Sequence, residues 1–194
     1  MDLLFEQVEP LFKKYVNVPH VEFEFRIGKK NGAFFDTNVG KDTFDKIYTA
    51  LEQYPSWENV LKTNQTVYYS GIKRYEYNED TLESKSIIKT TLSKIDSIME
   101  QFPYDVRFSI AEEKPISSIE DNEMESSKTK KRTSFIRKNL SIDLTVVEGE
   151  PEDMDDEEDV SYQVELEIIN PNKVKNKTEL YNLIYKIHSI LKPL

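Results

Sequence analysis

Side chains of opposite character alternate along many segments of the chain, and this alternation constrains the fold more than any other feature. In residues 21–27, VEFEFRI, the apolar side chains alternate with Glu22, Glu24 and Arg26. Successive side chains of a β-strand point to opposite faces of the sheet. The segment is therefore predicted to be a strand with one apolar and one charged face. Taken alone, it also fits a strand whose polar face is simply solvated.

A second segment near the end of the chain repeats the pattern, which a solvated face would not require. In residues 162–168, YQVELEI, the side chains of Gln163, Glu165 and Glu167 share one face. Carboxylates two residues apart on a strand are separated by about 7 Å and repel one another. Two such pairs brought together would make a strong site for a hard divalent cation.

The whole chain, residues 1–194, is predicted to form one antiparallel α+β domain. Helical periodicity covers residues 1–16, 41–54 and 178–191, and Asp42 is the predicted N-cap of the second helix. Strand patterns cover residues 66–78, 84–99, 104–113, 128–138, 140–148 and 161–169. A long run of strands between helices is typical of an antiparallel sheet, not of a parallel doubly wound one.

Nearly every predicted strand has one apolar face and one face of charged or hydroxyl side chains. The polar faces carry Arg74 and Glu76, then Arg107, Ser109 and Glu113, then Lys128, Lys130, Arg132 and Ser134, and finally Asp143 and Thr145. If the strands close into a barrel, these faces line its interior and the apolar faces meet the helices outside. Buried charges of both signs are costly unless they are paired or bind a ligand. Such a lumen suits a triphosphate with its metal ion.

Composition narrows the possible chemistry. The chain has no cysteine and two histidines, His20 and His188, which excludes disulfides, thiol nucleophiles and cysteine- or histidine-rich metal centres. A bound metal must therefore be held by oxygen, as magnesium, manganese and calcium are. The net charge is −10, but residues 148–159 hold nine acidic side chains, and the rest of the chain is nearly neutral. This block is predicted to be a solvated surface loop, so net charge does not argue against an RNA partner.

The chain resembles the RNA 5′-triphosphatases of fungal, protozoan and large-DNA-virus mRNA capping systems, which are triphosphate tunnel metalloenzymes. The glutamate pairs of EFEFR and VELEI match the first and last family motifs, and RFSIAEE, KTKKRTS and SIDLT resemble the internal tunnel strands in the same order. The similarity runs from Glu22 to Ile169 and extends to the viral branch, including the N-terminal domains of giant-virus capping enzymes. It implies a closed antiparallel barrel of roughly eight strands with a charged lumen and flanking helices.

The resemblance also implies a role for individual residues. Glu22, Glu24 and Glu167 would ligate Mg²⁺ or Mn²⁺, and Glu165 would be a further ligand or act on a metal-bound water. Glu113 would position the attacking water. The phosphates would be held by Arg74, Lys89, Arg107, Lys128, Lys130 and Arg132, of which the last two would also act in catalysis. Lys85 is an alternative to Lys89 in this role. Asp143, Thr145 and Gln163 would support the site. Relatives often carry glutamate at the position of Gln163 and arginine at the position of Lys128. The lysine of this chain keeps the positive charge but loses the bidentate geometry of an arginine.

The implied reaction converts 5′-triphosphate RNA to 5′-diphosphate RNA in mRNA capping, with nucleoside triphosphates as possible side substrates and guanylyltransferase or methyltransferase domains as partners. Three alternatives stay open. The first is another tunnel enzyme that hydrolyses nucleoside, inorganic or thiamine triphosphate. The others are a binding domain without turnover and an unrelated β protein. No segment is apolar enough to cross a membrane, and the lack of cysteine predicts an intracellular location, in host cytoplasm or virion for a viral protein and in the nucleus for a cellular one.

Overall fold

The computed structural model describes residues 1–117, 124–149 and 160–194. The described elements follow the order helix, two strands, helix, seven strands, helix. They are α1 (Asp2–Tyr15), β1 (Val21–Asn31), β2 (Phe34–Asp36), α2 (Lys41–Glu52), β3 (Asn59–Ser70), β4 (Lys73–Asn78), β5 (Ser84–Ser97), β6 (Asp105–Ile116), β7 (Ser126–Arg137), β8 (Leu140–Gly149), β9 (Val160–Ile168), the short 3₁₀ turn η2 (Pro171–Lys173) and α3 (Lys177–Leu191).

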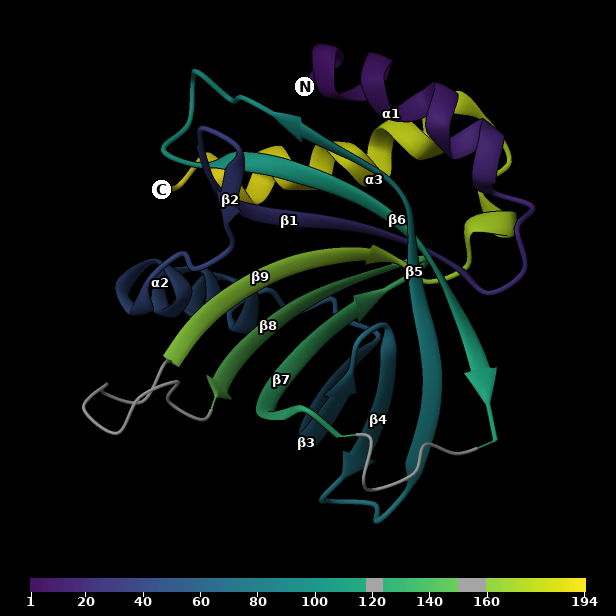
Figure 1. Cartoon of the computed structure of the whole chain (residues 1–194). Coiled ribbons are helices and arrows are strands. Elements are labelled where there is room, and N and C mark those ends of the chain that lie inside the picture. Colours follow the sequence, from purple (N-terminus) through teal and green to yellow (C-terminus); the bar gives the residue numbers. More distant parts are fainter. Residues whose placement is uncertain (118–123, 150–159) are drawn as a thin grey trace.

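Eight of the strands close into an antiparallel barrel (Figure 1). Their order around it is β1-β6-β5-β4-β3-β7-β8-β9, and β9 pairs again with β1. In this closing pair Glu24 lies opposite Glu167, and Arg26 lies opposite Glu165. The short strand β2 extends the sheet at β1, outside the ring. The closed eight-stranded barrel that the sequence predicts is therefore confirmed.

The apolar core lies outside the barrel, between its outer face and the helices. Phe23, Phe25 and Ile27 of β1 are at most 1% exposed and belong to this core. Helices α1 and α3 lie over β1 and β6, and Phe12 of α1 packs on Phe23 with ring centroids 4.7 Å apart. Helix α2 lies on the opposite flank, where its Phe44 contacts the ring of Tyr162 in β9. Burial of each such side chain contributes roughly 1.5–3 kcal/mol, so the outer face carries the stability of the fold.

Three local predictions need correction. Asp42 is not the N-cap of α2: the helix begins after Gly40, whose φ of 75° suits glycine, and Asp42 lies in the first turn. The predicted strand 66–78 is two strands that turn at Gly71, where φ is 55°. Strand β2 was not predicted, because three residues are too few to display a period. Of the predicted acidic loop, Glu148 and Gly149 end β8, and residues 150–159 lie outside the described part.

Candidate active site

The inner faces of the barrel strands enclose a cavity of about 180 Å³. Its lining is almost wholly polar and comes from all eight barrel strands: Glu22, Glu24, Arg26, Gln65, Val67, Arg74, Glu76, Lys85, Lys89, Glu113, Lys130, Arg132, Asp143, Glu165 and Glu167. On β1, β3, β4, β7 and β9 the lining side chains are two residues apart, as the alternation of a strand requires. The structure thus brings the predicted carboxylates and most of the predicted basic residues into one lumen.

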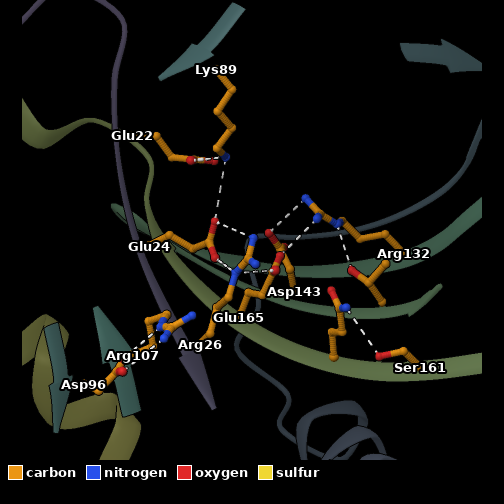
Figure 2. Close-up of polar contacts among 12 residues, drawn as sticks. Glu22, Glu24, Arg26, Lys89, Asp96, Arg107, Arg132, Asp143, Ser161 and Glu165 are labelled. Atoms are coloured by element: carbon orange, nitrogen blue, oxygen red, sulfur yellow. Dashed lines mark hydrogen bonds and ion pairs between the residues drawn. The ribbon is translucent and has the colours of Figure 1, made fainter. Parts of the chain in front are cut away.

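Arg26 joins the carboxylates of the first and last strands. Its guanidinium ion-pairs with Glu24, and its Nε lies 3.0 Å from Oε1 of Glu165. Both carboxylates are about 5% exposed. Burial acts to lower the pKa of Arg26, but the charges of Glu165 and Glu24 outweigh it and raise that pKa. The cation therefore stays charged and links β1 to its neighbour β9 on the lumen side of the sheet (Figure 2).

Arg132 of β7 approaches Glu165 from the opposite side. Its Nη2 donates a hydrogen bond to Oε2 of Glu165 at 3.0 Å, and its Nη1 lies 3.5 Å from Oδ2 of Asp143. Its Nε donates to Oγ1 of Thr145 at 3.0 Å, which fixes the plane of the guanidinium. Burial opposes ionisation of Glu165, yet Arg26 and Arg132 lower its pKa, so this glutamate is an anion held between two arginines.

Lys89 of β5 forms the third cationic contact. Its ammonium ion-pairs with Glu22, lies 2.8 Å from Oε1 of Glu113 and is 4.0 Å from Oε2 of Glu24. Burial works against the charge of Glu113, but Lys89 prevails and lowers the pKa of Glu113. Glu113 is therefore ionised and can accept a hydrogen bond from a ligand or a water in the lumen.

Two carboxylates of the lumen lie in surroundings that disfavour their charged forms. Burial, followed by the charge of Glu165, raises the pKa of Glu24 to about 7. Burial and the charges of Glu22 and Asp143 raise the pKa of Glu167 to about 8. Among the described residues, no side chain donates a hydrogen bond to Glu167 or ion-pairs with it. A cation placed between these groups would stabilise their charged forms.

The chemistry of this donor set fits a hard divalent metal ion. The donors are all carboxylate oxygens, which magnesium and manganese prefer. As they stand, Arg26 and Lys89 hold several of these oxygens, and no group of three acidic or histidine side chains in the described part of the chain is already arranged as a metal site. Ligand binding would therefore have to shift the contacts of these two cations.

Four of the predicted residues do not line the cavity. Arg107 ion-pairs with Asp96 at 2.6 Å and stacks on Phe35 of β2 with its Cζ 4.6 Å from the ring centroid. Lys128 is exposed, near the start of β7 and two residues before Lys130. Thr145 and Gln163 lie opposite each other on β8 and β9, where Thr145 accepts a hydrogen bond from Arg132. Their proposed roles stay predictions.

Four lining residues were absent from the predicted site, namely Arg26, Gln65, Val67 and Glu76, and a fifth, Lys85, was predicted only as an alternative to Lys89. The signal for Arg26 was present, because it follows Glu24 on the same face of β1. Gln65 and Val67 precede Tyr69 on β3 at intervals of two, but the predicted strand began only at residue 66. Lys85 ion-pairs with Glu76 at 3.0 Å, a contact between β5 and β4 that only their pairing discloses.

Comparison with solved structures places this barrel in a known fold. The RNA triphosphatase Pct1 of Schizosaccharomyces pombe, solved in complex with the Spt5 CTD, is similar with a TM-score of 0.84 at 15% identity, covering 97% of this chain and 93% of that one. The capping-enzyme triphosphatase of Mimivirus has a TM-score of 0.68 at 16% identity, covering 99% and 98%. At these identities the likeness concerns the fold. No curated protein sequence matches the chain significantly.

A closed antiparallel barrel with a lumen of paired charges defines the class of triphosphate tunnel proteins. The particular family follows from the sequence, because the model of "mRNA capping enzyme, beta chain", the mRNA triphosphatases, matches residues 12–182. The chain belongs to this family. It is therefore an RNA 5′-triphosphatase of mRNA capping. None of the helices in the described part is long and apolar enough to span a membrane.

Proposed function

We propose that the lumen removes the terminal phosphate of 5′-triphosphate RNA with a divalent cation, Mg²⁺ or Mn²⁺, bound by Glu22, Glu24 and Glu167. The observation that carries this proposal is the convergence of carboxylates from β1 and β9 opposite basic side chains from β4, β5 and β7. Family membership supports a divalent metal in general. When bound, the metal would neutralise phosphate charge and polarise the phosphoryl group.

The basic side chains of the lumen divide the work of holding the phosphates. Arg74 and Lys130 line the cavity, and neither ion-pairs with a carboxylate of the described residues. They are free to bind incoming phosphate oxygens. Arg132 is pre-oriented by Thr145 and Glu165 and presents a planar, bidentate donor. Because a phosphoryl-transfer transition state spreads charge over several oxygens, fixed donors of this kind stabilise it strongly.

Glu113 is the residue that we assign to the attacking water. It lines the cavity and is kept ionised by Lys89. A carboxylate in that state accepts a hydrogen bond from water and orients it for in-line attack. Lys89 also contacts Glu22, so a bound phosphate could take over its ammonium and release that glutamate to the metal. Glu165, held by two arginines, would complete the inner shell from the β9 side.

The similar structures suggest which proteins this chain acts with. The Mimivirus triphosphatase is described as a domain of a trifunctional mRNA capping enzyme, and the Pct1 structure contains the Spt5 CTD. We propose that this chain likewise acts beside guanylyltransferase and methyltransferase domains or subunits, inside the cell. The diphosphate end that it produces is the group a guanylyltransferase would consume.

Phosphate release tests the proposal directly. Equal concentrations of triphosphate-ended RNA, ATP, thiamine triphosphate and tripolyphosphate are compared with Mg²⁺, with Mn²⁺ and with a chelator. We expect RNA to give the highest kcat/KM and the chelator to abolish release. The exposed substitution Glu52→Gln serves as a control that should behave like the wild type. A wide preference for a substrate other than RNA would overturn the proposal.

A further inference from the structure

Tyr69 is the only aromatic residue on the inner faces of the eight barrel strands, within the part of the chain that the structure describes. It follows Gln65 and Val67, two cavity-lining residues, at intervals of two along β3. Its paired neighbours are Arg74 on β4 and Ser126 on β7. The other aromatic side chains of these strands, such as Tyr68 and Tyr75, point outward. An aromatic ring on an otherwise polar inner face, at the end of the cavity, calls for a functional explanation.

Two cations of the cavity contact this ring. The guanidinium Cζ of Arg74 lies 5.5 Å from the ring centroid, and Nζ of Lys130 lies 6.0 Å from it. Both distances are in the range of a cation–π attraction. The ring therefore holds these two cations on its own side of the lumen. It does not neutralise their charge.

These cations differ from the others in the lumen. Arg26, Lys89 and Arg132 are each held by at least two carboxylates. Arg74 and Lys130 make no such pair with a described residue, so their charge is available to an anionic ligand. Phosphates bound by this pair would lie directly beside Tyr69.

The place of Tyr69 on its strand fits the group that follows the phosphates in an RNA end. It is the next-to-last residue of β3, before the exposed turn at Gly71, and it lies opposite the exposed Ser126. The ring is thus at the rim of the barrel, between the charged interior and solvent. A triphosphate held inside would bring its own nucleoside to this rim.

We propose that Tyr69 forms a nucleoside subsite, on which the first base of the RNA stacks while Arg74 and Lys130 hold the adjoining phosphates. The inference rests on the proposed function, since it needs a substrate with a nucleoside next to the triphosphate. Stacking on an aromatic ring does not depend on base identity, so the subsite accepts any first nucleotide. It would separate triphosphate-ended RNA from inorganic polyphosphate, which offers the same phosphates and no base.

Tyr69→Leu tests the subsite against two ligands in one assay. We expect its kcat/KM for triphosphate-ended RNA to fall roughly 5- to 150-fold, the equivalent of about 1–3 kcal/mol for one stacked base. The inhibition constant of tripolyphosphate against that RNA should stay within about twofold of the wild type. Tyr69→Trp should retain the wild-type values, since it keeps an aromatic face.

Tyr68→Leu is the matched control, because it removes the neighbouring tyrosine from the outer face of the same strand. It should leave the preference for RNA over tripolyphosphate unchanged. If Tyr69→Leu weakens both ligands equally, the ring merely positions its cations and the proposal is wrong. An unchanged kcat/KM of Tyr69→Leu for triphosphate-ended RNA would also overturn the proposal. Failure of the proposed function is distinct, since the wild type itself would then prefer a substrate other than RNA by a wide margin.

Discussion

The two faces of strand β1 differ more than any two regions of the molecule. On the outer face Phe23, Phe25 and Ile27 are almost fully buried under the helices. On the inner face Glu24 is almost fully buried as well, yet it is an ionisable group that pairs with Arg26 and lies near other carboxylates, and its pKa is raised to about 7. The outer face gains free energy from apolar burial, whereas the inner face stores like-charge repulsion that a ligand can relieve. Stability and function are thus carried by alternate residues of one strand.

The largest effect is expected on the inner face. Glu24→Ala should lower kcat/KM for triphosphate-ended RNA about 1,000-fold or more, because it removes one of the proposed metal ligands from the transition state. The melting temperature should stay close to that of the wild type, since the substitution also removes a buried carboxylate whose burial and like-charged neighbours disfavour its ionised form. Phosphate release and thermal unfolding are measured on the same sample. Near-wild-type turnover would exclude Glu24 from the metal site.

The adjacent residue should behave in the opposite way. Phe25→Ala creates a cavity beside Phe108, whose ring centroid is 4.7 Å away, and should cost about 3–5 kcal/mol of unfolding free energy. The fraction that remains folded should retain a nearly normal turnover number. Urea denaturation and active-site titration separate the two quantities. If stability were unchanged, the outer face would not be the source of the fold's free energy.

A smaller contrast is expected on strand β7, between neighbouring residues. Arg132→Lys keeps the charge but loses the fork that reaches Glu165, Asp143 and Thr145, so kcat/KM should fall roughly 10- to 100-fold. Lys131→Arg is the control: this exposed residue points outward and pairs with Glu148. Steady-state kinetics of both variants decide the matter. Equal activity of the two would show that charge alone is needed at Arg132.

The smallest expected effect concerns Asp96 at the edge of the lumen. Hydrogen bonds from Arg107 and Lys30 lower the pKa of Asp96 to about 2. Because the folded pKa is below the ordinary value, this pair stabilises the protein above about pH 4, and the contribution is lost as the pH falls towards 2. Asp96→Asn should therefore lose about 1 kcal/mol of stability at pH 7 and only a small part of that at pH 2. Unfolding curves at pH 7 and pH 2 test the direction of this pH dependence. A greater loss of stability at pH 2 than at pH 7 would contradict it.

The sequence predicted the class of fold and the residues of the inner faces because both follow from local alternation. Glu22, Glu24, Glu165 and Glu167 share inner faces simply because they alternate with apolar residues. The pairing of those strands could not be predicted from the alternation within each strand. It came from the resemblance to a family and not from the residues themselves.

The partners of individual charges could not be predicted in the same way. Arg26 and Glu165 face each other only because the barrel closes between β1 and β9. Arg107 does not line the cavity and instead stacks on Phe35 of β2, a strand too short to recognise in the sequence. Ion pairs of this kind depend on register, and a single strand pattern leaves register open.

Anomalous diffraction from crystals grown with Mn²⁺ tests the central claim most directly, since it locates the metal without reference to activity. We expect one strong peak inside the barrel, bounded by carboxylate oxygens of Glu22, Glu24 and Glu167, with Arg26 or Lys89 displaced from its present contacts. A peak elsewhere, with these glutamates still paired to Arg26 and Lys89, would contradict the assignment of the lumen as a metal-dependent active site.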